Sequence, residues 1–103
     1  MISYQLNEIN QGLEVKLTGD LDIDSTEVME LELIPKLEQY SIVSLNLSSV
    51  PFIDSSGIGL LLNTVKALQE KEIQVTITEV KTEVMDVFDM IQLPEILGES
   101  VFR

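Results

Sequence analysis

The sequence predicts an α/β domain in which a mixed β-sheet of four to five strands, mostly parallel with an antiparallel N-terminal edge, is packed with three to four helices. Two observations carry this prediction. Segments in which apolar and polar residues alternate are interspersed with segments of helical periodicity, which is typical of parallel strands joined by crossover helices. A short polar turn separates the first two strand-like segments, which indicates a hairpin.

The strand segments differ in how strictly they alternate. Ser3–Ile9 alternates loosely, with Tyr4 and Leu6 among the candidates for one face, and Asn10–Gly12 is typical of a turn. After that turn, apolar and polar residues alternate strictly, as in a half-buried strand. Four strands and a short fifth candidate are predicted, at Ser3–Ile9, Leu13–Thr18, Ile42–Leu47, Ile73–Thr78 and Ser100–Phe102.

Helical periodicity predicts three helices and one further turn, at Thr26–Tyr40, Ser56–Lys71, Thr82–Ile91 and Pro94–Leu97. Asp24 or Ser25 can cap the first helix, and Pro35 either kinks it or begins a second turn. The second helix is expected to bury Ile58, Leu61, Leu62, Val65 and Leu68. The third is expected to bury Val84, Val87, Phe88 and Ile91.

Composition excludes several classes of function. The chain has no cysteine and no histidine, which excludes disulfides, thiolate catalysis, zinc fingers and a Ser-His-Asp hydrolase built from this chain alone. Its net charge of −12 disfavours nucleic acid and anionic membranes as partners and favours a protein with a basic face. Its 103 residues, 45% of them hydrophobic, predict one domain over residues 1–103.

The first twelve residues have no basic region followed by an apolar run, so no signal peptide is expected. No apolar run approaches the roughly 20 residues of a membrane span. We therefore expect a cytoplasmic location and no direct insertion into a membrane.

The segment most typical of a site is Asp54-Ser55-Ser56-Gly57, between a buried strand and the second helix. As plain structure, Asp and Ser cap helices. Two hydroxyls and a carboxylate exceed what one cap needs, and the positive end of a helix dipole suits a phosphate.

Two further features indicate a docking surface beside this segment. Gly57 and Gly59 lie in the first turns of a helix, where each costs about 1 kcal/mol relative to alanine. Leu60 is expected to face solvent together with Asn63, Thr64 and Ala67. A single exposed leucine is common, so this second signal is weak alone.

The acidic run Asp20–Asp24 resembles the first half of a calcium loop, but position 6 is Ser25 instead of glycine and position 12 is Leu31 instead of glutamate. A solvated turn is therefore the better interpretation, and no metal or cofactor is expected. Residues 17–35 carry six acids and no base, so this face is strongly negative.

Three stretches of the chain resemble the STAS domain of bacterial anti-sigma factor antagonists. They are LTGDLD at Leu17–Asp22, LNLSSVPFIDSSGIGLLL at Leu45–Leu62, and the helix-strand-helix that follows. The resemblance covers nearly the whole chain and implies a STAS-like mixed sheet. The chain departs from the family pattern at Asn46, where Asp is common, and at Ser49, where Gly is frequent.

The resemblance implies a partner-switching protein. The unmodified antagonist binds an anti-sigma factor that is also a serine kinase, which frees a sigma factor; the kinase then phosphorylates the antagonist and a serine phosphatase reverses this. Ser55 would be the phosphoacceptor, with Asp22, Asp54, Ser56 and Gly57 around it. The partner-binding candidates are Asp20, Ile58, Gly59, Leu60, Asn63 and Thr64.

Three alternatives stay open. A STAS domain can instead be a scaffold or a regulatory subunit of a sensory or transporter complex, although such a role does not need the DSSG acceptor. A two-component receiver would be phosphorylated on Asp54, but Asp54 lies several residues past Leu47, and Lys81 is the only late lysine. An enzyme would have to cluster Asp20, Asp22 and Asp54 with no basic residue nearby to position a substrate.

Overall fold

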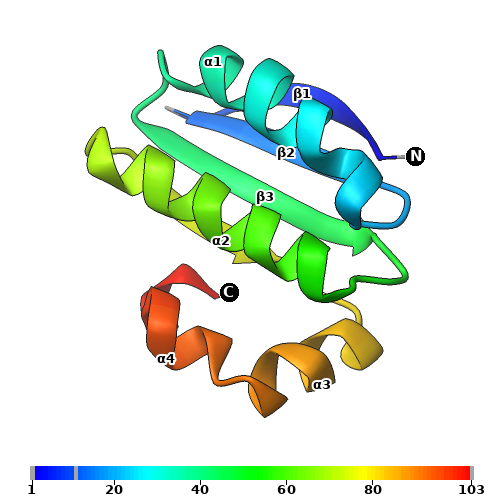
Figure 1. The fold of residues 1–103 in the computed structure, drawn as a ribbon. Coiled ribbons are helices and arrows are strands. Elements are labelled where there is room, and N and C mark those ends of the chain that lie inside the picture. The colour runs from blue at the N-terminus through cyan, green and yellow to red at the C-terminus, as the bar shows by residue number, and fades with distance from the viewer. Residues whose placement is uncertain (1, 11, 103) are drawn as a thin grey trace.

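The computed structural model describes residues 2–10 and 12–102, so Gln11 of the predicted turn lies outside the described residues. One sheet has the strand order β1-β2-β3-β4 (Figure 1). Its strands are β1 (Ser3–Ile9), β2 (Gly12–Thr18), β3 (Ile42–Ser49) and β4 (Gln74–Thr78). β1 pairs antiparallel with β2, and the other two pairings are parallel. The predicted mixed sheet with an antiparallel edge is confirmed.

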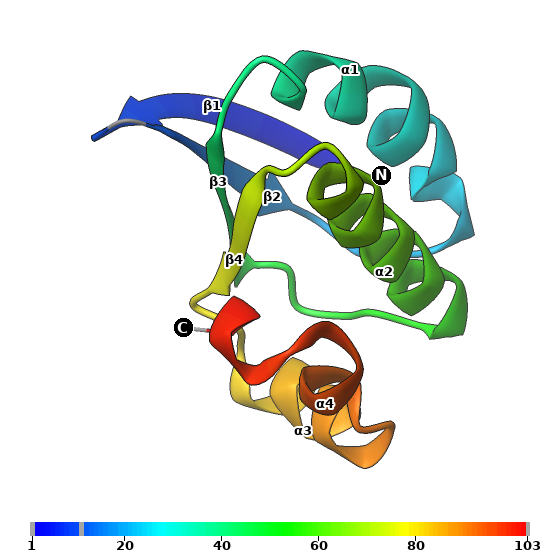
Figure 2. The same cartoon turned by 90° about the vertical axis from the view of Figure 1, so that its left-hand side faces the viewer.

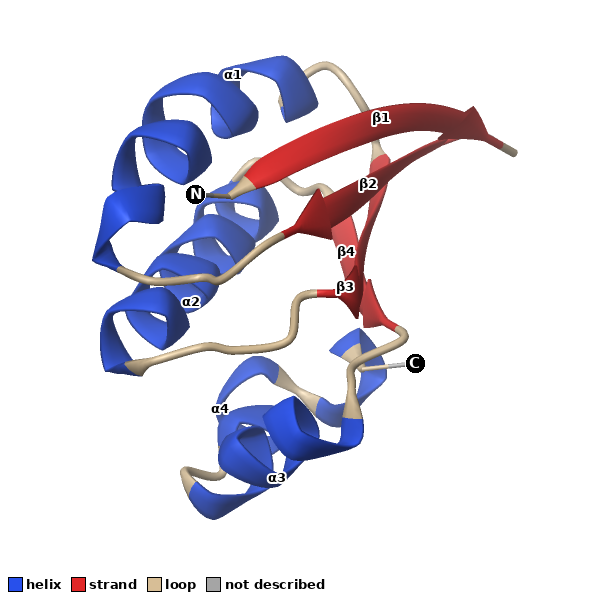
Figure 3. Cartoon of the chain, turned by 90° about the vertical axis from the view of Figure 1, so that its right-hand side faces the viewer, coloured by secondary structure: helices blue, strands red, loops and turns tan. Residues whose placement is uncertain are grey.

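The helical segments are η1 (Ile23–Ser25), η2 (Glu27–Leu33), α1 (Ile34–Leu37), α2 (Ser55–Glu70), α3 (Thr82–Met90), α4 (Leu93–Leu97) and η3 (Glu99–Val101). Figures 1 and 3 show α1 and α2 side by side on one face of the sheet. The pair α3 and α4 lies on the other side of α2 from α1, below β4 in Figure 2. In the described part of the chain, no helix is long and apolar enough to cross a membrane.

The core lies between the sheet and these helices. Alternate residues of β2, β3 and β4 are buried on that side: Leu13, Val15, Leu17, Val43, Leu45, Leu47, Val75 and Ile77. They form one cluster with buried residues of η2, α2, α3 and α4. This follows from the strict alternation of the strands, which places one apolar face against the helices.

Asn46, one of the departures from the family pattern, is buried on the opposite face of β3. Its side-chain amide donates a hydrogen bond to Glu14 Oε2 at 3.2 Å, and its Oδ1 accepts one from the backbone N–H of Ser48 at 2.8 Å. An aspartate here would bring a second carboxylate against Glu14. The asparagine and the glutamate therefore form a matched pair.

The first helix begins earlier than predicted. Asp22, instead of Asp24 or Ser25, is the N-cap, and the segment that follows is a turn of 3₁₀-helix, seven π-helical residues and the short α1. Pro35 lies in the first turn of α1, close to the second of the two predicted alternatives. Proline has no N–H, and in a regular α-helix its ring clashes with the carbonyl four residues earlier. The π-helical residues Glu27–Leu33 directly precede the turn that contains it.

Two predictions near the C-terminus are wrong. Ile91 is 42% exposed, because it terminates α3 just before the chain turns through a left-handed residue, Gln92. The expected strand at Ser100–Phe102 is instead a 3₁₀ turn followed by a single parallel bridge from Phe102 to Ile77. The Phe102 ring packs edge-on against Phe88, with ring centres 5.8 Å apart.

Candidate functional site

Two loops lie side by side at the N-terminal end of α2. Backbone N–H groups of Gly19 and Leu21 donate to the carbonyls of Ser49 and Phe52, each at 3.0 Å. In the other direction, Asp54 N–H donates to Leu21 O at 3.3 Å. These bonds extend the β2–β3 pairing beyond the sheet. They bring the acidic loop that contains Asp22 beside the start of α2.

Asp54 caps α2, as the preference of Asp for this position predicts. Its Oδ1 accepts a hydrogen bond from Gly57 N–H at 2.8 Å, and its carbonyl accepts one from Ile58 N–H at 2.9 Å. Ser55 and Ser56 are the first two helical residues; Ser55 is exposed and Ser56 half-buried. The capping role belongs to Asp54, so the helix does not depend on the Ser55 hydroxyl for its cap.

The two glycines of α2 have different surroundings. A Cβ built on Gly57 would lie 1.9 Å from the carbonyl oxygen of Leu21, so no larger residue fits while the two loops stay together. A Cβ built on Gly59 would meet nothing within 4 Å. The fold therefore requires glycine at position 57 and gives no reason for it at position 59.

The acidic loop is held by its own capping box. Asp22 Oδ1 accepts from Asp24 N–H at 3.1 Å, and Asp22 N–H donates to Ser25 Oγ at 3.2 Å. The buried Ser25 hydroxyl also donates to Asp20 O at 3.3 Å. The three-residue spacing of Asp22 and Ser25 is the signal that could have revealed this box in the sequence.

Carboxylates dominate the charge around the site. Asp20 and Asp24 are exposed, Asp22 and Asp54 are half-buried, and residues 17–35 and 42–65 include no Lys or Arg. Within residues 2–10 and 12–102, no three acidic side chains are grouped so that they could hold a metal ion. The arrangement offers a hydroxyl in a negative surface, and the carboxylates of Asp22 and Asp54 beside it accept capping hydrogen bonds.

The predicted solvent-facing patch on α2 is partly wrong. Leu60 is only 7% exposed and Thr64 is fully buried, its hydroxyl donating to Leu60 O at 2.8 Å. The reason is that α2 contacts η2 and α1 on one side and α4 on the other, as well as the sheet (Figure 1). The buried face is consequently rotated and contains Gly57, Leu60, Leu61, Thr64, Val65 and Leu68.

Four partner-binding candidates keep an accessible position. Asp20 and Asn63 are exposed, and Ile58 and Gly59 are partly exposed. Sequence reasoning missed Phe52, which is 52% exposed in the loop before Asp54. A large aromatic residue inside a predicted turn is the feature of the sequence that could have marked Phe52 as exposed.

Comparison with known proteins agrees with this geometry. The family model described as the STAS domain matches residues 3–103. An anti-sigma-B factor antagonist of Staphylococcus epidermidis is 33% identical over 85 residues, which is 82% of this chain and 79% of that protein.

The fold is similar to that of the anti-sigma factor antagonist SpoIIAA in its unphosphorylated form, with a TM-score of 0.74, 22% identity and coverage of 98% of this chain and 86% of that one. The phosphorylated form from Bacillus matches with a TM-score of 0.69, 21% identity and coverage of 98% and 89%. A sulfate transporter family protein from Wolinella succinogenes matches with a TM-score of 0.75 at 16% identity, over 86% of this chain and 73% of that one. This chain therefore belongs to the STAS domain family.

Proposed function

We propose that this chain is an anti-sigma factor antagonist that acts by partner switching. Its unphosphorylated form binds an anti-sigma factor that is also a serine kinase, and a sigma factor is released. Phosphorylation of Ser55 ends this binding, and a serine phosphatase restores it. The name of the Staphylococcus epidermidis relative and the two solved forms of SpoIIAA support the proposal.

The observation that carries the proposal is an exposed Ser55 hydroxyl next to a helix cap supplied by Asp54. Because Asp54 already satisfies the helix end, Ser55 can be modified without uncapping α2. In the transfer, Ser55 Oγ attacks the γ-phosphorus of ATP bound to the kinase, ADP leaves, and the hydroxyl proton passes to a base of the kinase. This chain supplies only the acceptor and is a substrate instead of an enzyme.

Local charge explains why phosphorylation would end binding while the fold persists. The phosphate adds a charge of about −1.5 to −2 at neutral pH. The α2 dipole and its free first-turn amides stabilise that charge from within the domain. A partner surface fitted to a neutral hydroxyl would instead have to desolvate a dianion, at a large cost in binding free energy.

The surface around Ser55 supports a close partner contact. Asp20 lies in the neighbouring acidic loop, Ile58 in the first turn of α2 and Asn63 about two turns along it, all with accessible side chains. Gly59 adds an open stretch of helix backbone where the fold itself has room for a side chain. We assign that open stretch to the approach of the partner, together with Asp22, Ser56 and Gly57 as the surroundings of the acceptor.

Intact-mass spectrometry after incubation with the cognate anti-sigma kinase and ATP tests the proposal. Wild type and Ser56→Ala are expected to gain one phosphate, and Ser55→Ala none. Ser56→Ala is the matched control, because it removes the neighbouring hydroxyl and leaves the acceptor in place. Phosphate on Ser55→Ala would contradict the assignment of the acceptor.

A second function is a regulatory subunit of a transporter or sensory complex, which the likeness to the sulfate transporter family protein supports. An unmodified wild type, with a kinase proven active on another antagonist, would favour this second function. Stable co-purification with a membrane complex would then be expected.

A further inference from the structure

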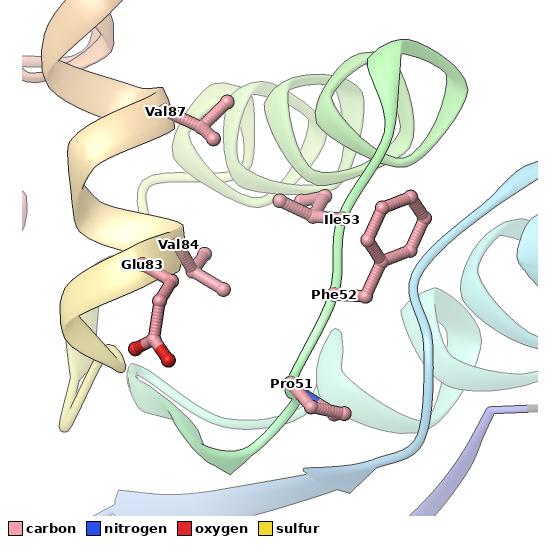
Figure 4. Close-up of a pocket in the computed structure, with 6 residues that line it drawn as sticks. All are labelled: Pro51, Phe52, Ile53, Glu83, Val84 and Val87. Carbon is pink, nitrogen blue, oxygen red and sulfur yellow. The ribbon is translucent and has the colours of Figure 1, made fainter.

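An apolar pocket lies between the β3–α2 loop and α3. Its volume is about 210 Å³, and Figure 4 shows the side chains around it. The lining residues are Pro51, Phe52, Ile53, Glu83, Val84 and Val87. The loop half of this lining leads directly into Asp54 and Ser55, so the pocket adjoins the proposed acceptor.

The floor and the rim of the pocket differ in burial. Ile53 and Val84 are 5% and 3% exposed and belong to the main core, so they form a packed floor. Val87 is partly exposed at the rim, and Phe52, whose ring points away from Val84 and Val87 in Figure 4, is 52% exposed beside it. A fixed floor with an open apolar rim is typical of a hollow that receives one side chain from a partner.

The apolar surface continues along α3. Glu83, Val87 and Met90 are four and three residues apart, so they lie along one stripe of the helix. Met90 is 82% exposed, a high value for a large apolar residue. The stripe therefore extends the apolar surface of the pocket from Val87 to Met90, and the Glu83 carboxylate lies at its opposite end.

Charge decides between the possible occupants. A second copy of this chain would bring its own net charge of −12 against the same charge, which opposes association through this face. Glu83 at the pocket, and Asp20, Asp24 and Asp54 at the neighbouring helix end, favour a basic partner. The occupant is thus expected to be an apolar side chain flanked by Lys or Arg.

We infer that this pocket receives an apolar side chain of the anti-sigma kinase, flanked by basic residues, while the same kinase contacts Ser55. The inference rests on the proposed function and adds an anchoring point that lies outside the α2 surface. Because Ile53 and Ser55 are separated only by Asp54, one partner surface reaches both. The pocket supplies affinity, and Ser55 supplies the switch.

Phosphorylation kinetics with the cognate kinase and ATP test the inference. Val87→Phe fills the pocket and is expected to raise KM for the antagonist at least about tenfold, because an excluded aliphatic side chain forfeits burial worth roughly that factor. Since the acceptor is untouched, kcat is expected to stay within about twofold. Phe52→Ala, at a 52% exposed position, is also expected to raise KM, because it removes apolar contact area beside the pocket.

Ile9→Phe is the matched control. Ile9 is 45% exposed and pairs with Gly12 at the end of the sheet away from Ser49, where the acceptor loop begins. Its KM is expected to equal that of wild type. Glu83→Gln is expected to raise KM and to weaken its dependence on salt, because a carboxylate facing a basic partner is removed.

Three outcomes would overturn the inference. Wild-type KM for both Val87→Phe and Phe52→Ala would exclude the pocket from the kinase interface. A wild-type dimer in sedimentation that Val87→Phe abolishes would assign the pocket to a second copy of the chain. A lower kcat at unchanged KM would mean that the substitutions disturb Ser55 instead of docking. Failure of the proposed function is distinct, since wild type itself would then gain no phosphate.

Discussion

Gly57 and Gly59 lie two residues apart in α2, yet they face different surroundings. Gly57 packs against the Leu21 carbonyl, and the contact holds the acidic loop against the helix end. Gly59 faces open space, and the fold does not use its missing side chain. The first position is explained by the folded domain, whereas for the second we propose the approach of a partner. Sequence alone gives the two glycines the same meaning.

The largest effect is expected when the buried position is changed. Gly57→Ala forces a methyl group into the Leu21 carbonyl, so the two loops must move apart. Overpacking of this kind is expected to lower the free energy of unfolding by about 3 kcal/mol, measured by urea denaturation. A value within about 0.5 kcal/mol of wild type would show that the loop contact is not needed.

A smaller loss is expected when the helix cap is removed. Asp54→Ala leaves Gly57 N–H without its 2.8 Å acceptor and is expected to cost about 1 kcal/mol. Asp54→Asn keeps a good cap and serves as the control, with little change expected. Equal losses in both variants would mean that the charge of Asp54, and not its cap, stabilises this end of α2.

The open position is expected to respond in the opposite direction. Gly59→Ala adds helix propensity without a clash and is expected to raise the free energy of unfolding by up to about 1 kcal/mol. The same variant is expected to bind the anti-sigma kinase more weakly in calorimetry. Unchanged binding together with raised stability would remove Gly59 from the partner surface.

The smallest effect on stability is expected from the modification itself. A phosphate on Ser55 is stabilised by the α2 dipole and opposed by Asp22 and Asp54, so the free energy of unfolding is expected to change by less than about 1 kcal/mol. Thermal unfolding of the phosphorylated and unphosphorylated forms measures this difference. If the phosphorylated form unfolded at a temperature many degrees lower, phosphorylation would act by changing the conformation of the domain and not only its surface.

Much of the fold could be predicted because its signals are local. The alternation of Leu13–Thr18 and the cap-type Asp54 both depend on neighbours in sequence, and both predictions agree with the structure. The burial of Leu60 and Thr64 could not be predicted, because it depends on α4 and η2 closing over α2. The cap of the first helix was misplaced because Asp22 and Asp24 are equally good cap residues.

The candidate site combines local and non-local features. The segment Asp54–Gly57, which contains the proposed acceptor, is contiguous, so its composition alone marks it. The pocket joins residues 51–53 to residues 83–87, and no local pattern connects segments that far apart. The open surroundings of Gly59 are likewise a property of the folded surface, which a sequence does not display.

The hydrogen bonds that hold the acidic loop to the acceptor loop run entirely between backbone atoms of Gly19, Leu21, Ser49, Phe52 and Asp54. Backbone groups survive nearly every substitution, so the two loops stay together under most exchanges of side chains, provided that position 57 remains glycine. During evolution, the exposed residues of this surface can therefore be exchanged to select a new partner while the backbone geometry that joins the two loops is kept. Surface residues that can change recognition and backbone contacts that keep the loops in place thus lie within the same part of the chain, residues 19–54.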